Sequence, residues 1–301
     1  MSRALSGPAR GHLAMLVFSA LVAGSFSLGA LSANLIDPAV LNAVRFWIAA
    51  AIIGALALAT TGLPRRASRA PWRYLLLGGL FAAYFVLMFE GLKTANPVST
   101  SAVFTLTPLM SAGFAWLLMR QRLTGRMGAA LIVGGAGAVW VIFRADLAAL
   151  LRFEIGHGET LYFYGCIAHA LYTPLVRRLN RGESPVVFTF GMLVAGGVLL
   201  GLWAAPEIAA TRWADLPPIV WVTLAYVAVF ASSAAFLALQ YATLHLPAAK
   251  VMAYTYLTPS WVIVWEMALG QGAPRGMVLL GIAATVAALL ILLKDEEGAG
   301  G

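Results

Sequence analysis

Ten apolar runs, each long enough to cross a lipid bilayer, follow one another along this chain. A hydrocarbon core of about 30 Å is crossed by about 20 residues of α-helix. Helix is the expected structure because lipid offers no partners to the backbone groups of an open strand. We therefore predict an all-α polytopic membrane protein with ten transmembrane helices. The predicted spans are residues 12–34, 38–61, 72–92, 97–119, 127–144, 160–179, 185–205, 217–240, 247–270 and 274–294.

Composition excludes several other classes of protein. Hydrophobic residues make up 61% of the chain and charged residues 11%, which is more apolar surface than a soluble domain can bury. The net charge of +8 raises the possibility of nucleic-acid binding, but the basic residues lie in short loops between apolar runs, so no nucleic-acid partner is expected. The single cysteine, Cys166, excludes an internal disulfide and a cysteine-ligated metal site, and the four histidines have no metal-ligand spacing. We expect no metal and no cofactor.

The basic residues also predict the orientation of the chain. With a cytoplasmic N-terminus, thirteen of them fall on the cytoplasmic side: Arg3, Arg10, Arg65, Arg66, Arg69, Arg73, Arg120, Arg122, Arg126, Arg177, Arg178, Arg181 and Lys294. Five fall on the other side: Lys93, Arg144, Arg152, Arg212 and Arg275. Because positive charge is enriched in cytoplasmic loops, we predict a multi-pass protein of the inner membrane with both termini in the cytoplasm.

A stretch around one proline-containing motif occurs twice. Residues 97–126 contain Thr-Leu-Thr-Pro at 105–108, and residues 247–275 contain Tyr-Leu-Thr-Pro at 256–259. Ten spans divide into two sets of five, and an odd number forces the second set to enter the membrane from the opposite side. The chain is thus predicted to contain two inverted five-helix repeats. The predicted segments are a first repeat at 1–144, an extracytoplasmic linker with a short surface helix at 145–159, a second repeat at 160–294 and a disordered tail at 295–301.

The fifth and tenth spans are rich in glycine and alanine and carry almost no polar groups. Such small faces allow close helix packing, so these spans are expected at the periphery of the bundle. Their glycine content alone supports no more than a monomer or a weak homodimer. The glycines concerned are Gly128, Gly134, Gly135, Gly137, Gly276 and Gly281.

The two five-helix halves, each with a Leu-x-Pro helix and a Gly/Ala-rich last span, resemble the EamA family of the drug/metabolite transporter superfamily. Val44–Ala51 is similar to the family's Arg-Phe-x-x-Ala-Ala signature. Within the family the chain looks most similar to the YddG-type exporters of amino acids. The family's Leu-Gly-Glu motif ends its fourth and ninth helices, whereas Gln121 and Gln271 stand there in this sequence. The resemblance implies export of small metabolites without a cofactor, with the third, fourth, eighth and ninth helices at the centre.

Ionisable residues inside the predicted spans need a physical reason because a charge at membrane depth is costly. Lys250 either extends to the interface or contacts a substrate carboxylate near the inner end of the cavity. Arg45 lies deeper, and we assign it to gating; the alternative is a structural arginine that binds carbonyl groups or Asp37. Glu90 and Glu266 lie near helix ends and are expected at the interface.

Polar and aromatic residues at helical spacing form stripes on the helices expected at the centre. Such stripes either join helices to each other or line a shared cavity. We predict a substrate cavity, whose aromatic, apolar and neutral polar lining suits neutral or zwitterionic solutes. On the sixth span, Tyr162, Cys166, His169 and Thr173 share one face, and His169 is either a core histidine or a group that makes transport pH-dependent. The predicted cavity residues are Tyr84, Met88, Ser101, Thr105, His169, Tyr172, Gln240, Lys250, Tyr254 and Thr258.

Two prolines at matching positions, Pro108 and Pro259, are predicted hinges. A proline inside a helix removes one backbone hydrogen bond and kinks the helix, which leaves a carbonyl group free. Prolines are also common in membrane helices as simple packing kinks. Their equivalent places in both halves favour a role in alternating access.

The function predicted from these features is secondary transport: export of amino acids or related small metabolites across the inner membrane. The alternative within transport is efflux of drugs or lipophilic cations, which requires a buried carboxylate in the cavity. A membrane enzyme requires a clustered His/Asp/Glu site, and a channel requires a continuous polar lining; the sequence provides neither. The expected partners are a small-molecule substrate and membrane lipid.

Overall fold

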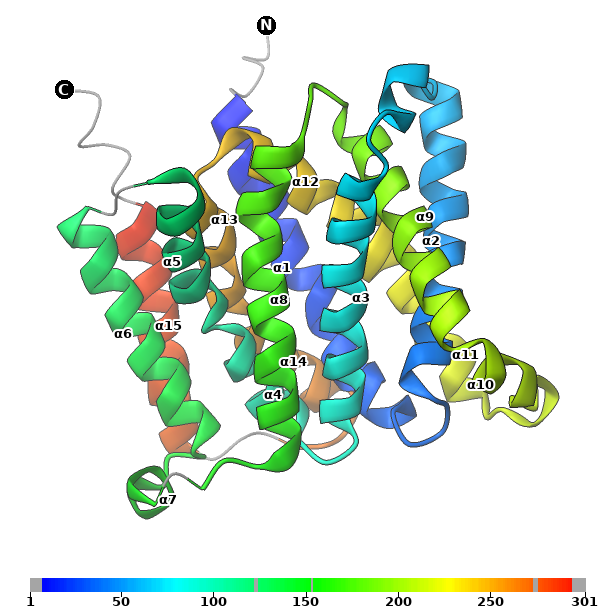
Figure 1. The fold of residues 1–301 in the computed structure, drawn as a ribbon. Helices are drawn as coiled ribbons and strands as arrows, with labels where there is room; N and C mark the ends of the chain where they lie inside the picture. The colour runs from blue at the N-terminus through cyan, green and yellow to red at the C-terminus, as the bar shows by residue number, and fades with distance from the viewer. Residues whose placement is uncertain (1–6, 122–123, 153, 273–275, 294–301) are drawn as a thin grey trace, which may run out of the picture.

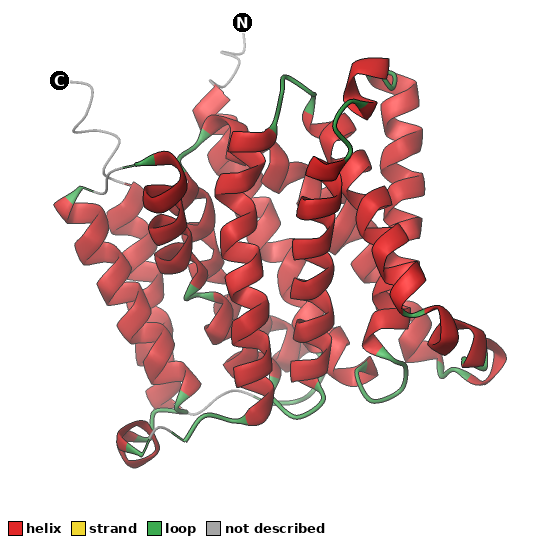
Figure 2. Ribbon diagram, in the orientation of Figure 1, coloured by secondary structure: helices red, strands yellow, loops and turns green. Residues whose placement is uncertain are grey.

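The computed structural model of the chain describes residues 7–121, 124–152, 154–272 and 276–293. Within these ranges every regular element is helical and no strand occurs (Figure 2). The predicted tail 295–301 and the basic residues Arg3, Arg122, Arg275 and Lys294 lie outside them. The helices of the first part are α1 (Gly7–Ser32), α2 (Pro38–Thr60), η1 (Arg65–Ser68), α3 (Trp72–Leu92), α4 (Pro97–Phe104), α5 (Thr107–Met119) and α6 (Gly125–Ile142). Those that follow are α7 (Leu147–Leu151), α8 (His157–Leu179), α9 (Pro185–Trp203), α10 (Ala205–Ala210), η2 (Trp213–Asp215), α11 (Pro218–Tyr226), η3 (Val227–Ala234), α12 (Ala235–His245), α13 (Ala248–Ala253), η4 (Tyr254–Leu257), α14 (Thr258–Ala268) and α15 (Gly276–Leu293).

Eight helical stretches in the described residues are long and apolar enough to cross a membrane. They are α1, α2, α3, α4 with α5, α6, α9, Pro218–His245 and α15. The predicted spans 160–179 and 247–270 are helical but are not among the eight. The first is more polar, and the second is divided between α13, η4 and α14. The multi-pass helical architecture is thus confirmed, and the count of ten stays a prediction.

The long helices run between two edges of the bundle (Figure 1). The start of α1, the end of α15, η1 and the loop between α8 and α9 lie at one edge. We call it the terminal edge. The short helices α7 and α10 lie at the opposite edge, which we call the α7 edge. The apolar content of residues 145–159 predicted a short helix there, and α7 confirms it.

The long helices pack side by side, with α6 and α15 together at one side of the bundle (Figure 1). α6 packs along α15, α2 along α9, and α3 between α8 and α9. The α6–α15 contact depends on two glycines, because a Cβ on Gly137 would lie 2.6 Å from the Gly281 carbonyl oxygen. Part of the small face predicted for these spans is therefore buried within the chain itself.

The outer surface of the bundle is strongly apolar. Large side chains that are more than half exposed occur on several helices, among them Trp116, Leu117, Ile132, Leu202 and Leu280. Side chains of this kind on many helices suit contact with lipid tails rather than water.

Candidate functional site

Aromatic rings from three helices form a buried cluster. α3 contributes Phe81, Tyr84 and Phe85, α8 contributes Tyr172 and other rings, and α12 contributes Phe236. The Phe81 ring centroid lies 4.0 Å from that of Tyr172 and 4.5 Å from that of Phe236. These contacts join helices that are far apart in the sequence, so the cluster is a meeting point of both halves of the chain.

His169 and Tyr162 extend this cluster along one face of α8. The His169 ring lies 4.6 Å from Tyr84 and 5.1 Å from Phe104 of α4. The hydroxyl oxygens of Tyr162 and Tyr84 are 2.8 Å apart. Cys166, between Tyr162 and His169 in the stripe predicted from the sequence, is fully buried.

Several buried polar groups near this cluster have no hydrogen-bond partner among the residues that the structure describes. They are Nδ1 of His169, the hydroxyls of Tyr172 and Thr173, and both amide atoms of Gln240; the hydroxyl of Thr258, at the start of α14, is also buried without a partner in the described residues. A buried polar atom left unpaired costs about 1–3 kcal/mol. A solute with hydrogen-bond donors and acceptors would satisfy these groups.

Other predicted cavity residues have their polar atoms occupied. The hydroxyls of Ser101 and Thr105 donate to Val98 and Ala102 of their own helix, at 2.8 and 2.7 Å. Tyr254 lies against α1, with its hydroxyl 3.0 Å from His12 Nδ1.

Two further predicted cavity residues are buried. Met88 is fully buried one turn after Tyr84, and Lys250 is 6% exposed on α13. The structure thus brings Tyr84, His169 and Tyr172 together in the cluster, while the hydroxyls of Ser101 and Thr105 bind backbone in α4.

The helices that contain Pro108 and Pro259 are broken rather than kinked. α4 ends at Phe104 and α5 begins at Thr107, with Pro108 in its first turn. A proline there loses nothing, because the first N–H groups of a helix have no partner within it. Thr107 Oγ1 donates to the Phe104 carbonyl at 2.7 Å and so satisfies a group that the break frees.

The second half has the equivalent break at η4, followed by Pro259 in the first turn of α14. The two breaks meet, since Thr107 Oγ1 lies 3.3 Å from Thr255 Oγ1. The sequence predicted the position of each interruption within a few residues, but not that each helix would end and restart.

Arg45 on α2 is completely buried and contacts neutral groups. Its Nε donates to Ser232 Oγ at 2.5 Å and its Nη1 to Asn42 Oδ1 at 3.2 Å. The guanidinium carbon lies 3.6 Å from the centroid of the Phe85 ring. Asp37 does not pair with it, because its carboxylate accepts from the backbone N–H groups of Ala39 and Val40 and caps α2.

A cavity of about 860 Å³ opens at the α7 edge, between α4, α6, α8 and α14. Its described lining includes four carboxylates, Asp146, Glu154, Glu159 and Glu266, and one arginine, Arg144. Glu159 is 3% exposed and accepts a hydrogen bond of 2.7 Å from Ser99 Oγ. Glu90 does not line this cavity and pairs with Lys93 at 2.8 Å, as expected for an interfacial residue.

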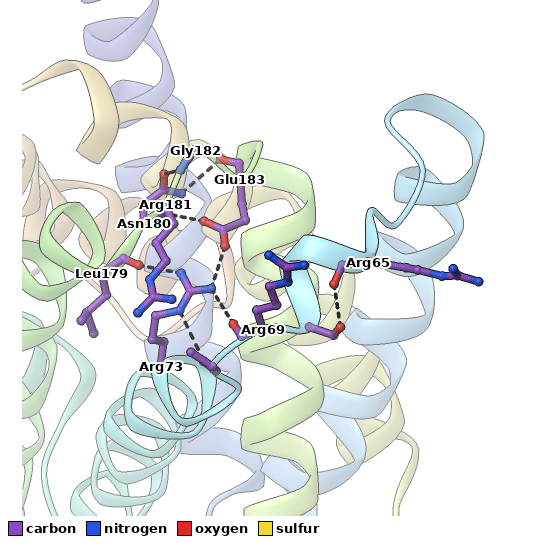
Figure 3. Close-up of polar contacts among 10 residues, drawn as sticks. Arg65, Arg69, Arg73, Leu179, Asn180, Arg181, Gly182 and Glu183 are labelled. Atoms are coloured by element: carbon purple, nitrogen blue, oxygen red, sulfur yellow. Dashed lines mark hydrogen bonds and ion pairs between the residues drawn. The ribbon is translucent and has the colours of Figure 1, made fainter.

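At the terminal edge, Arg73 connects the loop before α3 with the loop between α8 and α9 (Figure 3). It donates to Glu183 Oε1 and to the Leu179 carbonyl, each at 2.7 Å, and to the Arg69 carbonyl at 3.1 Å. Both partners of the Arg73–Glu183 ion pair are almost fully buried. Burial raises the pKa of Glu183, but hydrogen bonds from Arg73 and from backbone N–H groups outweigh it, so that this pKa lies below its ordinary value.

The profile of the EamA-like transporter family matches residues 9–143 and again residues 157–294. The chain belongs to the EamA-like transporter family. It is also similar to the uncharacterized transporter YyaM of Bacillus subtilis, with 25% identity over 280 residues that cover 90% of this chain and 92% of YyaM. A solved structure described as "Crystal structure of protein" matches with a TM-score of 0.71 and 22% identity, over 95% of this chain and 96% of that one. That likeness concerns the fold alone.

The family match and the eight apolar helical stretches show that the chain is a multi-pass membrane protein of a transporter family, as the sequence predicted. Membership of the EamA-like transporters points to a small-molecule substrate and to a role other than catalysis. Of the two glutamines that replace the family's carboxylate, Gln121 has its Oε1 buried without a partner in the described residues, and Gln271 lines the cavity at the α7 edge.

Sequence reasoning missed three features of this EamA-like transporter. Glu159 was assigned to the linker, although a glutamate three residues after Gly156 is typical of a first helical turn. Glu183 is the one carboxylate between Arg181 and the proline that opens α9, and this setting could have indicated an ion pair. The π-helix η3 had no recognisable sequence signal.

Proposed function

We propose that this EamA-like transporter is a secondary carrier that exports amino acids with aromatic, apolar or neutral side chains, and related small metabolites, by alternating access. The observation that carries the proposal is the buried aromatic cluster with unpaired polar atoms on His169, Tyr172 and Gln240. Rings bind an apolar side chain, and imidazole, phenol and amide groups bind the amino and carboxyl groups of a zwitterion. Neutral donors and acceptors suit such a solute better than a multiply charged phosphate, which requires paired cations.

Alternating access follows from a proposed architecture of ten crossings in two inverted repeats, residues 1–144 and 160–294, joined by the linker 145–159. Two separate matches to one family profile support this division. Helix packing supports it as well, because contacts between the halves come in equivalent pairs: α3 packs on α8 as α12 packs on α1, and α5 on α8 as α14 on α1. A site on the pseudo-two-fold axis can then be reached from either side as the repeats exchange conformations.

The two edges of the bundle differ as expected for a transporter that is open at the α7 edge and closed at the terminal edge. The α7 edge has the cavity of about 860 Å³, whereas at the terminal edge the Arg73–Glu183 pair closes two loops on each other. We assign Pro108 and Pro259 to the hinges, because each starts a new helix at a break and the two breaks touch. Arg45 stays a proposed gating residue, and Lys250 and the other predicted cavity residues stay in the proposed substrate path.

Orientation in the inner membrane is proposed from the positive charge of the terminal edge, where η1 and the end of α8 carry arginines. Both termini are then cytoplasmic and the cavity at the α7 edge faces outward. Reporter proteins fused to either end should be active only in the cytoplasm, and activity outside the cell would reverse the orientation.

We propose a monomer or a weak homodimer, since Gly137 and Gly281 are used within the chain.

The direct test is counterflow in proteoliposomes. Vesicles containing the purified protein are loaded with one unlabelled amino acid and then given the same amino acid labelled outside, across a panel of all 20. We expect transient accumulation of label for aromatic and apolar amino acids and none in protein-free vesicles. Absence of accumulation for every amino acid would overturn the proposed substrate class.

Efflux of lipophilic cations is the second candidate, and Glu159 is the observation that favours it. This carboxylate is buried, lines the cavity at the α7 edge and has Ser99 as its partner. Tetraphenylphosphonium in the same assay distinguishes the two functions. Accumulation of this cation without accumulation of amino acids would replace the first proposal with the second.

A further inference from the structure

Arg45 is a permanent positive charge in the interior of the bundle. It is the eighth residue of α2, so it lies about 10 Å along the helix axis from Pro38. Its side chain is completely buried, and no ion pair links it to a carboxylate in the part of the chain that the structure describes. Its acceptors are a hydroxyl, a side-chain amide and, at 3.5 Å, the Ala231 carbonyl. A guanidinium has five N–H donors, so its hydrogen-bonding capacity exceeds these three contacts.

The second half of the chain indicates that the scaffold does not need this charge. When the prolines that open α2 and α9 are aligned, Arg45 corresponds to Met192 and Asn42 to Thr189. Met192 is completely buried too, on the helix that packs along α2. A neutral side chain of similar length therefore occupies the equivalent place, and packing does not account for a guanidinium in one half only.

The surroundings of Arg45 connect it to the candidate substrate site. Its guanidinium lies over the Phe85 ring, and Phe85 stacks on Phe236 with centroids 5.5 Å apart and an interplanar angle of 14°. Gln240, with its unpaired amide, is one turn after Phe236 on α12. A cation and a neutral donor–acceptor group thus flank the same pair of rings.

Two contacts of Arg45 are made with η3, a π-helix between α11 and α12. Ser232 Oγ and the Ala231 carbonyl both belong to this segment. π-Helical turns are rare and occur frequently at functional sites.

We propose that Arg45 binds the carboxylate of the transported solute, whose apolar side chain then lies against Phe85 and Phe236. This assignment rests on the proposed function and adds its specificity determinant. A carboxylate matches the fork of a guanidinium with two parallel hydrogen bonds and supplies the negative charge that Ser232 and Asn42 cannot. The site then selects substrates with a free carboxylate over the corresponding amides and amines.

The test compares phenylalanine, or whichever amino acid of the panel exchanges fastest, with its carboxamide in proteoliposomes. On the wild type we expect the carboxamide to compete at least about tenfold more weakly than the amino acid. Arg45→Met, which introduces the residue found at the equivalent position of the second half, should raise the KM for the amino acid about ten- to hundredfold. It should also abolish the preference for the amino acid over its amide, which a purely structural role of Arg45 would leave intact.

Equal competition by the amino acid and its carboxamide on the wild type would overturn the assignment. An Arg45→Met variant that keeps both the wild-type KM and the preference for the amino acid over its carboxamide would overturn it as well. If Arg45→Met does not give a monodisperse protein on size exclusion, Arg45→Lys and the wild-type comparison decide. Arg45→Lys keeps the charge but loses the fork, so the preference should persist with a raised KM. Failure of every amino acid to exchange would instead overturn the proposed function, and this assignment with it.

Discussion

Gln240 lies on α12 with both amide atoms buried and without a hydrogen-bond partner in the described part of the chain. Neighbouring Thr243 is equally buried, but its hydroxyl donates to the Leu239 carbonyl at 2.7 Å. The fold thus provides a hydrogen-bond partner for the Thr243 hydroxyl but none for the Gln240 amide. An amide retained at such a cost is expected at a binding site, where stability is given up for function.

Replacing Gln240 with leucine should separate transport from stability. Leu has a similar size and removes both unpaired atoms, so we expect an unchanged or higher melting temperature and at least about a tenfold loss of exchange rate. The control is Thr243→Val, which should leave exchange unchanged. Loss of melting temperature without loss of exchange in Gln240→Leu would mean that the amide serves the fold.

Arg73 and Glu183 form a buried ion pair whose strength depends on pH. The pKa of Glu183 is lowered in the folded protein, so the pair stabilises the fold at pH values above the unfolded-state pKa of about 4.3. That contribution is lost as the pH falls through the lower folded-state pKa. We expect the melting temperature of the detergent-solubilised protein to drop below about pH 4.

Glu183→Gln should remove this part of the pH dependence. At neutral pH it leaves Arg73 without its carboxylate, which for a buried pair costs about 3–5 kcal/mol. The wild type and the variant should therefore differ most near pH 7 and converge in acid. Glu154→Gln is the control, because its partner Arg152 is exposed and 3.7 Å away. Parallel curves for wild type and Glu183→Gln across the whole pH range would contradict the assignment.

At the scale of elements, the contact between α6 and α15 depends on the absence of side chains. Besides its approach to the Gly281 carbonyl, a Cβ on Gly137 would lie 2.9 Å from Cβ of Ala284. The same helix contains Gly128, where an added Cβ meets nothing within 4 Å. One helix thus holds both a glycine that the packing requires and one that it does not.

Gly137→Val should force α6 and α15 apart and lower the melting temperature, with a cost of about 1–3 kcal/mol or more from overpacking. Gly128→Ala should stabilise by up to about 1 kcal/mol, because alanine is the better helix former at an open position. Thermal unfolding monitored by tryptophan fluorescence measures both. A stable Gly137→Val variant would show that the two helices do not depend on this close contact.

The broken helices give the second element-scale prediction. In Pro108→Ala, residue 108 gains an N–H that can bind the Phe104 carbonyl, four residues earlier, and so join α4 to α5. We expect the exchange rate to fall several-fold while the KM changes little, because a hinge affects conformational exchange more than binding. Pro185→Ala, at the start of the unbroken helix α9, is the control. Equal rates in wild type and Pro108→Ala would remove this proline from the hinge.

For the molecule as a whole, hydrophobic runs and their lengths sufficed to predict a multi-pass helical bundle, because lipid restricts the backbone to so few structures. They also gave most of the long helices within a few residues. The full end and restart of the helix at Thr107 and the π-helix η3 were not predicted; both lie at contacts between distant parts of the chain, Thr107 with Thr255 and Arg45 with Ser232, which helical spacing does not reveal.

The candidate site was predicted in part for the same reason. Helical spacing identified Tyr84, His169 and Gln240 as candidates, but spacing cannot tell which hydroxyls turn back to their own helix, as those of Ser101 and Thr105 do. Nor can it place Glu183 beside Arg73, 110 positions earlier in the chain.

The proposed alternating access requires that the buried aromatic cluster can be reached in turn from each side of the membrane. Cys166 tests it directly, because it is the only cysteine in the sequence and lies fully buried between Tyr162 and His169. The measurement is the rate at which a membrane-impermeant methanethiosulfonate reagent modifies Cys166 in right-side-out and in inverted vesicles, followed by intact-protein mass. We predict modification from both sides and protection from both by a transported amino acid, with Cys166→Ala as the unreactive control. Modification from one side only, or from neither, would contradict alternating access at this cluster.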